Sequence, residues 1–232
     1  MKKKKKILVV DIGGTNVKLM ISREEKRKFA SGKKLSPKQL VADIHEAAAD
    51  WEYEGVSLGF PAPVRDGHIL TDPKHLAPGW MAFDFAKAFG KPMRLINDAA
   101  MQALGSYHGG RMLFLGLGTG LGSCLIWDRN VLPLELGDLP YPGVKRIEDV
   151  VGKIGLERLG KKAWRREVLL VLKSLKSAFI AEYVVVGGGN AKQFDELPEG
   201  FELGANRNAY DGGVRLWETD ARTRRSKWNI ID

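Results

Sequence analysis

The sequence predicts a mixed α/β protein made of two halves. Apolar runs rich in β-branched residues, which are typical of buried strands, end repeatedly in glycine turns. Between them lie stretches whose apolar residues recur at helical spacing. The strand pattern begins again at Arg111, and no low-complexity linker separates the two parts. We therefore expect two α/β halves with their boundary near Arg111.

The first half is expected to place strands before and after one amphipathic helix. A very short connection follows the first strand, so the first two strands should form a hairpin. Ser36, Pro37 and Gln39 are typical of a helix start, because they occupy the cap, first and third helical positions. The stretch 61–80 is rich in turn residues. The expected strands cover 6–12, 17–22, 27–33, 55–60 and 92–97, and the expected helices cover 36–51, 83–90 and a segment beginning at Ala99.

The second half is expected to repeat this alternation around a longer helix. Two strands, over 112–117 and 122–132, should flank a glycine turn. A helical region follows from Ile147 to Ala181, because its apolar residues recur at helical spacing. The remaining expected elements are a buried strand over 182–187, a helix over 190–197 and a last short helix over 208–217.

The composition is that of a globular protein. Hydrophobic residues make up 44% of the 232 residues and charged residues 28%. No apolar run approaches the roughly 18 residues that cross a bilayer, and the first residues lack the apolar core of a signal peptide. The single cysteine, Cys124, excludes an internal disulfide and a multi-cysteine zinc site. We therefore expect a cytoplasmic protein with no membrane partner.

The net charge of +9 is concentrated at the two ends of the chain. Lys2 to Lys6 contribute five positive charges, and the segment 219–232 contributes a net +2, which leaves +2 for the rest. A nearly neutral body does not favour a nucleic-acid partner. The basic ends are either solvated or serve to attract a polyanion such as polyphosphate by long-range steering. Deleting residues 2–6 should weaken the use of polyphosphate if the second interpretation holds.

Three glycine-rich turns each follow an apolar strand, at 11–16, 116–123 and 187–190. Backbone N–H groups in such turns can approach an anion closely and bind phosphate. None matches the P-loop pattern, and each alone is also common as a tight turn. Asp11 and Thr15 in the first turn could organise Mg²⁺ and a terminal phosphate. Thr119 in the second turn could hold another phosphate.

Asn97 and Asp98 end an apolar strand side by side, which has two interpretations. Both residue types are good helix N-caps, since their side chains satisfy free N–H groups of the first turn. The carboxyl ends of strands in α/β sheets are also where substrates bind. The pair is therefore either a cap or part of a site, and a carboxylate can serve as both.

Six motifs in order, "DIGGTNVK", "GFPAPV", "INDAA", "GLGTGLGS", "LELG" and "VVGGGN", resemble the ROK family of sugar kinases, with its glucokinase and polyphosphate glucokinase branch nearest. The resemblance covers about residues 6–217. It implies the actin-like ATPase fold, in which two ribonuclease-H-like domains close on a nucleotide in the cleft between them. The implied domains are 1–108, completed by a C-terminal helix at about 208–232, and 109–207.

The resemblance also implies a role for each motif. Asp98 is the expected general base of phosphoryl transfer to a hexose, most simply glucose, and the expected sugar-binding residues are Asn97, Glu135 and Asp138. Asp11 is expected to hold Mg²⁺ through water. ATP or polyphosphate is the expected donor, and its binding residues are Asp11, Gly13, Gly14, Thr15, Gly118, Thr119, Gly120, Gly187, Gly188 and Gly189.

The sequence departs from the family pattern in three places. Asp138 stands where the family has histidine, and the family's cysteine-rich zinc motif is missing, so no zinc is expected. His75 lies near the position of a family asparagine and is either a sugar contact or a surface residue. Asp138 is the one feature that supports a non-catalytic sugar sensor acting through a protein partner. A phosphohydrolase of the same superfamily, with water in place of the sugar, is the other alternative. A repressor is not expected, since the first strand begins at about residue 6 and leaves no room before it for a DNA-binding domain. Family members commonly form homodimers.

Overall fold

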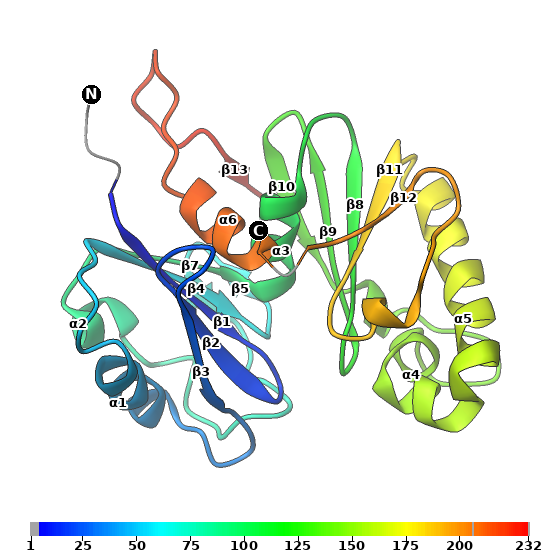
Figure 1. The fold of residues 1–232 in the computed structure, drawn as a ribbon, viewed down its shortest axis with the longest axis horizontal. Helices are drawn as coiled ribbons and strands as arrows, with labels where there is room; N and C mark the ends of the chain where they lie inside the picture. Colours follow the sequence, from blue (N-terminus) through cyan, green and yellow to red (C-terminus); the bar gives the residue numbers. More distant parts are fainter. Residues whose placement is uncertain (1–4, 206, 232) are drawn as a thin grey trace.

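The computed structural model describes residues 5–205 and 207–231, so Lys2 to Lys4 of the basic run and Asp232 lie outside the described residues. Two β-sheets stand side by side with two helices between them (Figure 1). The mixed α/β class is therefore confirmed. Within the described segments, no helix has both the length and the apolar character needed to cross a membrane.

The first sheet has the strand order β3-β2-β1-β4-β7. β1 pairs antiparallel with β2 and parallel with β4, which in turn pairs parallel with β7. The predicted hairpin and the five predicted strands of this half are confirmed. Their bounds are β1 (Ile7–Ile12), β2 (Asn16–Met20), β3 (Lys26–Ala30), β4 (Gly55–Phe60) and β7 (Met93–Asn97).

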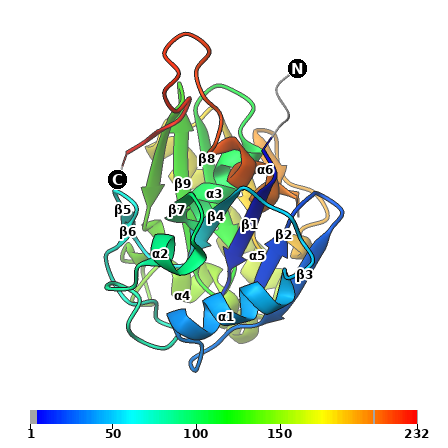
Figure 2. The same cartoon turned by 90° about the vertical axis from the view of Figure 1, so that its left-hand side faces the viewer.

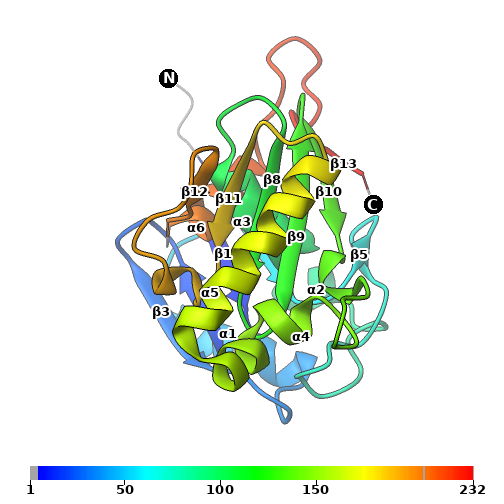
Figure 3. The ribbon, with the colours of Figure 1, turned by 90° about the vertical axis from the view of Figure 1, so that its right-hand side faces the viewer.

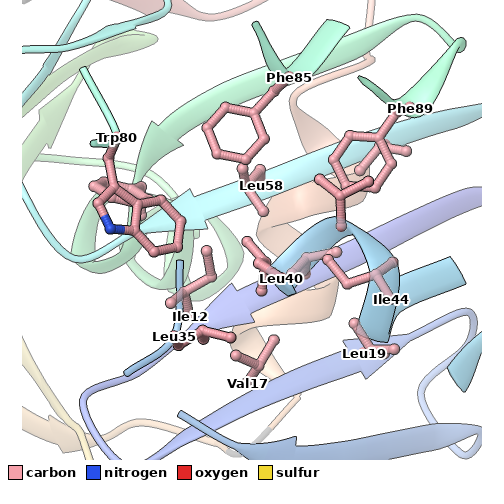
Figure 4. Packing of buried hydrophobic residues seen from close by; sticks show 14 of the residues in the cluster. Ile12, Val17, Leu19, Leu35, Leu40, Ile44, Leu58, Trp80, Phe85 and Phe89 are labelled. Atoms are coloured by element: carbon pink, nitrogen blue, oxygen red, sulfur yellow. The ribbon is translucent and has the colours of Figure 1, made fainter. Parts of the chain in front are cut away.

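Helices α1 (Pro37–Ala47) and α2 (Phe85–Phe89) cover the outer face of this sheet (Figure 2). The Ser36 side chain accepts a hydrogen bond from the Gln39 N–H, so the predicted cap of α1 is confirmed. Leu40 and Ile44 of α1 point into a core that also contains Leu58 of β4 (Figure 4). The turn-rich stretch after β4 includes a small hairpin of β5 (Val64–Arg65) and β6 (His68–Ile69).

The second sheet has the order β12-β11-β8-β9-β10-β13. Helices α4 (Glu148–Val151) and α5 (Lys153–Ala178) cover its outer face (Figure 3). Trp164 of α5 is fully buried in the core beneath them. The predicted helical region is thus confirmed, with a kink where Gly160 adopts a φ of 72°. The strands are β8 (Met112–Leu117), β9 (Leu121–Trp127), β10 (Asn130–Leu134), β11 (Tyr183–Gly187), β12 (Phe201–Leu203) and β13 (Asn229–Ile230).

Helices α3 (Asp98–Ser106) and α6 (Asn208–Arg215) lie between the two sheets (Figure 1). The Asn208 amide donates to the Ser106 hydroxyl at 2.6 Å, and Ser57 Oγ of β4 donates to the Gly213 carbonyl at 2.7 Å. A third apolar cluster forms around these helices from residues of both sheets. The start of α3 lies between the two sheets, since Gly59 of β4 faces Asp98 Cα and Gly122 of β9 faces Ala99 Cβ.

Three sequence predictions for the second half are wrong in detail. The stretch 122–132 is a hairpin, β9 and β10, because Asp128 and Arg129 both adopt positive φ and reverse the chain. The segment 190–197 forms only a 3₁₀ turn, Ala191–Gln193, since so short a segment does not sustain an α-helix before Pro198.

The third error concerns the end of the chain. The predicted helix at 208–232 ends at Arg215. β13 then pairs in parallel with β10, so the end of the chain joins the second sheet and not the first. Trp228 is buried just before β13 and anchors this return. α6 packs against α3 and the first sheet, and Trp217 just after it donates its indole N–H to Ser57 Oγ of β4 at 2.8 Å.

Candidate active site

The first glycine turn connects β1 to β2 and is braced from β3. Its Gly13 N–H donates to the Asn16 carbonyl at 3.0 Å. Ser31 donates from its hydroxyl to the Gly13 carbonyl at 2.7 Å and from its N–H to the Thr15 carbonyl at 3.0 Å. Gly14 and Thr15 stay exposed at the tip of the turn. The turn therefore has a fixed shape and an accessible end.

The second glycine turn connects β8 to β9 and is held from two sides. The Gly118 N–H donates to the Gly120 carbonyl at 3.1 Å, and the Lys153 N–H at the start of α5 donates to the Thr119 carbonyl at 3.2 Å. Asn190 of the third glycine turn donates its amide to the Gly118 carbonyl at 2.9 Å. The second and third turns therefore form one unit.

The three glycines of the third turn differ in their surroundings. Gly188 and Gly189 are exposed, whereas Gly187 is buried. A Cβ on Gly187 would lie 2.5 Å from the Phe114 ring, so this position must be glycine for packing reasons. Of these three glycines, a ligand can therefore reach Gly188 and Gly189.

The first and second glycine turns face each other although they come from different sheets. A Cβ placed on Gly14 would lie 3.4 Å from Thr119 Oγ1 and 3.8 Å from His75 Cδ2. His75 is exposed and belongs to the turn-rich stretch after β4. The structure thus brings the two predicted phosphate-binding turns together and places His75 beside them.

Asn97 takes the capping role, which is one of the two interpretations that the sequence left open for this pair. α3 begins at Asp98, one residue before the predicted start, and Asn97 is its N-cap. Asn97 Oδ1 accepts from the Ala100 N–H at 3.1 Å, and Asp98 Oδ1 accepts from the Ala99 N–H at 2.8 Å. Capping by the neighbouring residue leaves Asp98 available for chemistry.

Three carboxylates gather at this point, and their proximity changes the acidity of Asp98. The pKa of Asp98 is raised to about 8, chiefly by burial and to a smaller extent by the negative charges of Asp11 and Glu135. Asp11 ends β1 and is only 3% exposed. The pKa shift of Asp98 therefore reports a compact acidic site at the ends of β1 and β7.

Lys18 is a member of this site that the motif analysis missed. Its ammonium lies 3.1 Å from Asp11 Oδ2. Lys18 pairs with Asp11 across the β1–β2 hairpin. A hairpin centred between Gly14 and Thr15 places positions 11 and 18 opposite each other. The hairpin predicted from the sequence was therefore enough to place Lys18 beside Asp11.

Glu135 and Asp138 lie on the turn that follows β10. Ser123 Oγ donates to the Leu134 carbonyl at 2.7 Å and accepts from the Leu136 N–H at 3.1 Å, which fixes this turn against β9. Desolvation, then the charge of Asp138, raises the pKa of Glu135, although its side chain still reaches solvent. Asp138 is paired with Arg146 at 3.0 Å and with Lys74 at 3.4 Å. Neither cation was predicted.

The acidic site suits a magnesium ion bound chiefly by phosphate and water. Mg²⁺ is usually held by one or two carboxylates together with substrate phosphates. Asp11 lies at the start of the first glycine turn, close enough to Asp98 for its charge to raise the pKa of that carboxyl. Within residues 5–205 and 207–231, no three His, Cys, Asp or Glu side chains are arranged as a metal cage. These residues therefore fit an ion that arrives with the phosphoryl donor.

A large cavity of about 870 Å³ lies elsewhere, between the start of β1, the end of α3 and α6. None of the described residues that line it belongs to the predicted site. Its charges are mixed: Arg23, for example, pairs with Asp211 at 2.8 Å. The predicted site residues therefore lie at and around the glycine turns and not in this cavity.

Comparison with known families agrees with the motifs. The family model described as "ROK family" matches residues 7–133, which is more than half of the chain. The chain belongs to the ROK family. The matched region contains the first two glycine turns, Asn97 and Asp98.

Two solved structures of sugar kinases share the fold. An inorganic polyphosphate/ATP-glucomannokinase from Arthrobacter sp. strain KM superposes with a TM-score of 0.77 at 22% identity, over 90% of this chain and 97% of the other. A ROK family glucokinase from Streptomyces griseus, solved with glucose and AMPPNP, gives a TM-score of 0.74 at 17% identity, over 91% and 98%. The fold of the chain is therefore that of ROK sugar kinases.

A curated relative, the bifunctional enzyme NanE/NanK of Brucella melitensis, is 27% identical over 79% of this chain. The chain spans only 45% of the length of that bifunctional enzyme. The likeness therefore concerns one part of the relative.

Proposed function

We propose that this ROK protein is a sugar kinase that transfers a phosphoryl group from ATP or polyphosphate to a hexose, with glucose as the first candidate. The observation that carries the proposal is the meeting of two glycine turns from different sheets beside Asp98. Phosphoryl transfer requires a donor cradle and a base for the acceptor hydroxyl at one place. The names of the two structural neighbours support the same activity and both donors.

Each half contributes one part of this arrangement. We propose two ribonuclease-H-like domains, residues 1–108 together with α6, and residues 109–207, with the substrates in the cleft between them. The first turn belongs to one domain and the second turn to the other. Closure of the two domains would bring donor and acceptor together and exclude water, which is a competing acceptor.

The sugar is proposed to bind where β7 ends and α3 begins. Glu135 can accept two hydroxyl hydrogen bonds, which suits a polyol. Because Asn97 Oδ1 is used in the cap, its amide N–H groups are those that would orient the reacting hydroxyl. Asp98 would accept the proton of that hydroxyl as the oxygen attacks phosphorus. A pKa near the working pH is what a general base requires.

The donor is proposed to lie along the glycine turns. Backbone N–H groups of Gly13, Gly14, Gly118 and Gly120, with the Thr15 and Thr119 hydroxyls, would bind phosphate oxygens. Gly188 and Gly189 would lie along the adenosine of ATP. Bound Mg²⁺ would neutralise charge on the transferred group, and Asp11 would hold it through water.

The pH dependence of the rate follows from the raised pKa of Asp98. A base is active when deprotonated, so kcat/KM for the sugar should rise with pH and level off above about pH 8. This parameter reports ionisations of the free enzyme. A profile that is flat from pH 5 to pH 9 would contradict the assignment of Asp98.

Activity assays on the purified protein test the proposed function. We expect turnover of glucose with Mg²⁺ and at least one of the two donors, ATP or polyphosphate. Turnover of another hexose in a panel would keep the kinase and change the sugar. Sugar binding without turnover of any hexose would favour the sensor.

A further inference from the structure

A cluster of charged side chains connects the second glycine turn to the turn that carries Glu135. Arg146 is at its centre. One guanidinium nitrogen, Nη1, lies 2.7 Å from Glu148 Oε1 and 3.0 Å from Asp138 Oδ1, and the other, Nη2, lies 3.3 Å from Asp149 Oδ1. Lys74 of the first half adds contacts of 3.4 Å to Asp138 and 3.5 Å to Glu148. The cluster therefore joins residues of both halves.

Glu148 lies between the two turns and contacts both. Its Oε2 occupies the space that a Cβ on Gly120 would need, and its own Cβ would lie 3.4 Å from a Cβ on Gly137. Gly120 belongs to the proposed donor turn and Gly137 to the turn after Glu135. The Glu148 side chain is 20% exposed. A movement of this carboxylate would therefore displace both the turn that contains Gly120 and the turn that contains Gly137.

We propose that Arg146 is a positioning residue that fixes Glu148 between these turns, so that donor binding and sugar binding are coupled. This inference rests on the proposed kinase function. It makes Asp138 a partner of Arg146 and Lys74 and not a direct ligand of the sugar. Removing the Arg146 cation leaves Asp138, Glu148 and Asp149 with Lys74 as the remaining cation of the cluster. Repulsion then moves Glu148 away from Gly120.

The geometry of the cation matters as well as its charge. Arginine presents a planar fork of donors, whereas lysine is a point charge. Arg146 uses two nitrogens on three carboxylates, which one ammonium cannot reproduce. Arg146→Lys should therefore restore only part of what Arg146→Gln loses.

Arg165 supplies a matched control. It pairs with Asp195 at 2.6 Å, and its side chain is 28% exposed against 30% for Arg146. It lies on α5 and belongs to neither turn. Arg165→Gln removes the same charge and one ion pair from the same half, outside the cluster around Arg146.

The first test measures hydrogen exchange in the protein without ligands. In Arg146→Gln we expect amides of residues 117–122 and 135–139 to exchange at least about fivefold faster than in the wild type. Arg165→Gln should leave both segments unchanged, and Glu148→Gln should resemble Arg146→Gln more weakly. Equal exchange in Arg146→Gln and Arg165→Gln would overturn the proposal. This readout decides the inference even if no sugar is phosphorylated.

The second test measures the coupling itself. For the wild type, saturating sugar should lower the KM for the donor. In Arg146→Gln we expect the donor KM to rise about tenfold and to become independent of sugar, while kcat changes less than threefold. Arg146→Lys should recover part of the dependence. Retained sugar dependence in Arg146→Gln would overturn the proposal, whereas absence of turnover in the wild type would overturn only the proposed kinase function.

Discussion

Replacing Asp98 with asparagine is expected to lower kcat by about 10²–10⁴-fold, the usual contribution of a general base. Asparagine keeps the size of the side chain and still accepts a hydrogen bond from the Ala99 N–H, but it cannot take a proton from a hydroxyl. Sugar binding should change little. Initial rates with glucose, Mg²⁺ and the preferred donor measure the effect.

Asp84 provides the control for this substitution, because it is also an aspartate at a helix start. Its side chain caps α2 by accepting from the Lys87 N–H at 2.9 Å. Asp84→Asn keeps a good capping residue and lies outside the proposed site, so its rate should match the wild type. An Asp98→Asn enzyme as fast as Asp84→Asn would remove Asp98 from the mechanism.

Asp98→Asn should also be more stable than expected from the wild type in alkaline solution, because the variant has no carboxyl to ionise at position 98. Because the folded-state pKa of Asp98 is about 8 and its ordinary value is 3.8, folding favours the protonated acid. That stabilisation is complete below about pH 4 and is lost as pH rises through the folded pKa, by up to about 1.4 kcal/mol per pH unit. Asp98→Asn lacks this loss. Urea unfolding at pH 6 and pH 9 should therefore show a smaller decrease for the variant than for the wild type.

Among the substitutions proposed here, Gly212→Ala is expected to lower the free energy of unfolding most. A Cβ on Gly212 would overlap the Met101 carbonyl of α3 and lie 2.9 Å from the Gly105 nitrogen, so two helix backbones would have to separate. Alanine would otherwise favour a helix by about 1 kcal/mol. We expect overpacking to outweigh this and cost about 3 kcal/mol. For a chain of this size each kcal/mol lowers Tm by about 2–4 °C.

Gly189→Ala is the matched control for stability, since a Cβ there would meet nothing within 4 Å. Its Tm should stay within about 2 °C of the wild type. If Gly212→Ala melts at the same temperature as Gly189→Ala, α3 and α6 do not pack as closely as described.

The sequence predicted those parts of the fold that depend on local patterns. Ser36, Pro37 and the apolar positions of α1 act within one helix, and the prediction there is confirmed. The β9–β10 hairpin was missed because its turn uses Asp128 and Arg129 at positive φ, where glycine or asparagine is the usual signal. The pairing of β13 with β10 depends on residues about 100 positions apart, which no local pattern encodes.

The candidate site also contains residues that local sequence patterns predict and residues that only the structure reveals. The glycine turns and Asp98 each follow a predicted strand, so local patterns were enough to single them out. Lys18 could have been found from the symmetry of the first hairpin. Lys74 and Arg146 reach Asp138 across loops, and loop conformation was not readable from spacing. The role of Asp138 therefore depended on the structure.

The most direct test of the central claim is to follow the phosphoryl group by ³¹P NMR in a reaction containing Mg²⁺, donor and glucose. We expect a sugar phosphate as the main product, with little inorganic phosphate, and we expect Asp98→Asn to form the sugar phosphate about 10²–10⁴-fold more slowly. Release of inorganic phosphate at the same rate with and without sugar would contradict it and make the protein a phosphohydrolase.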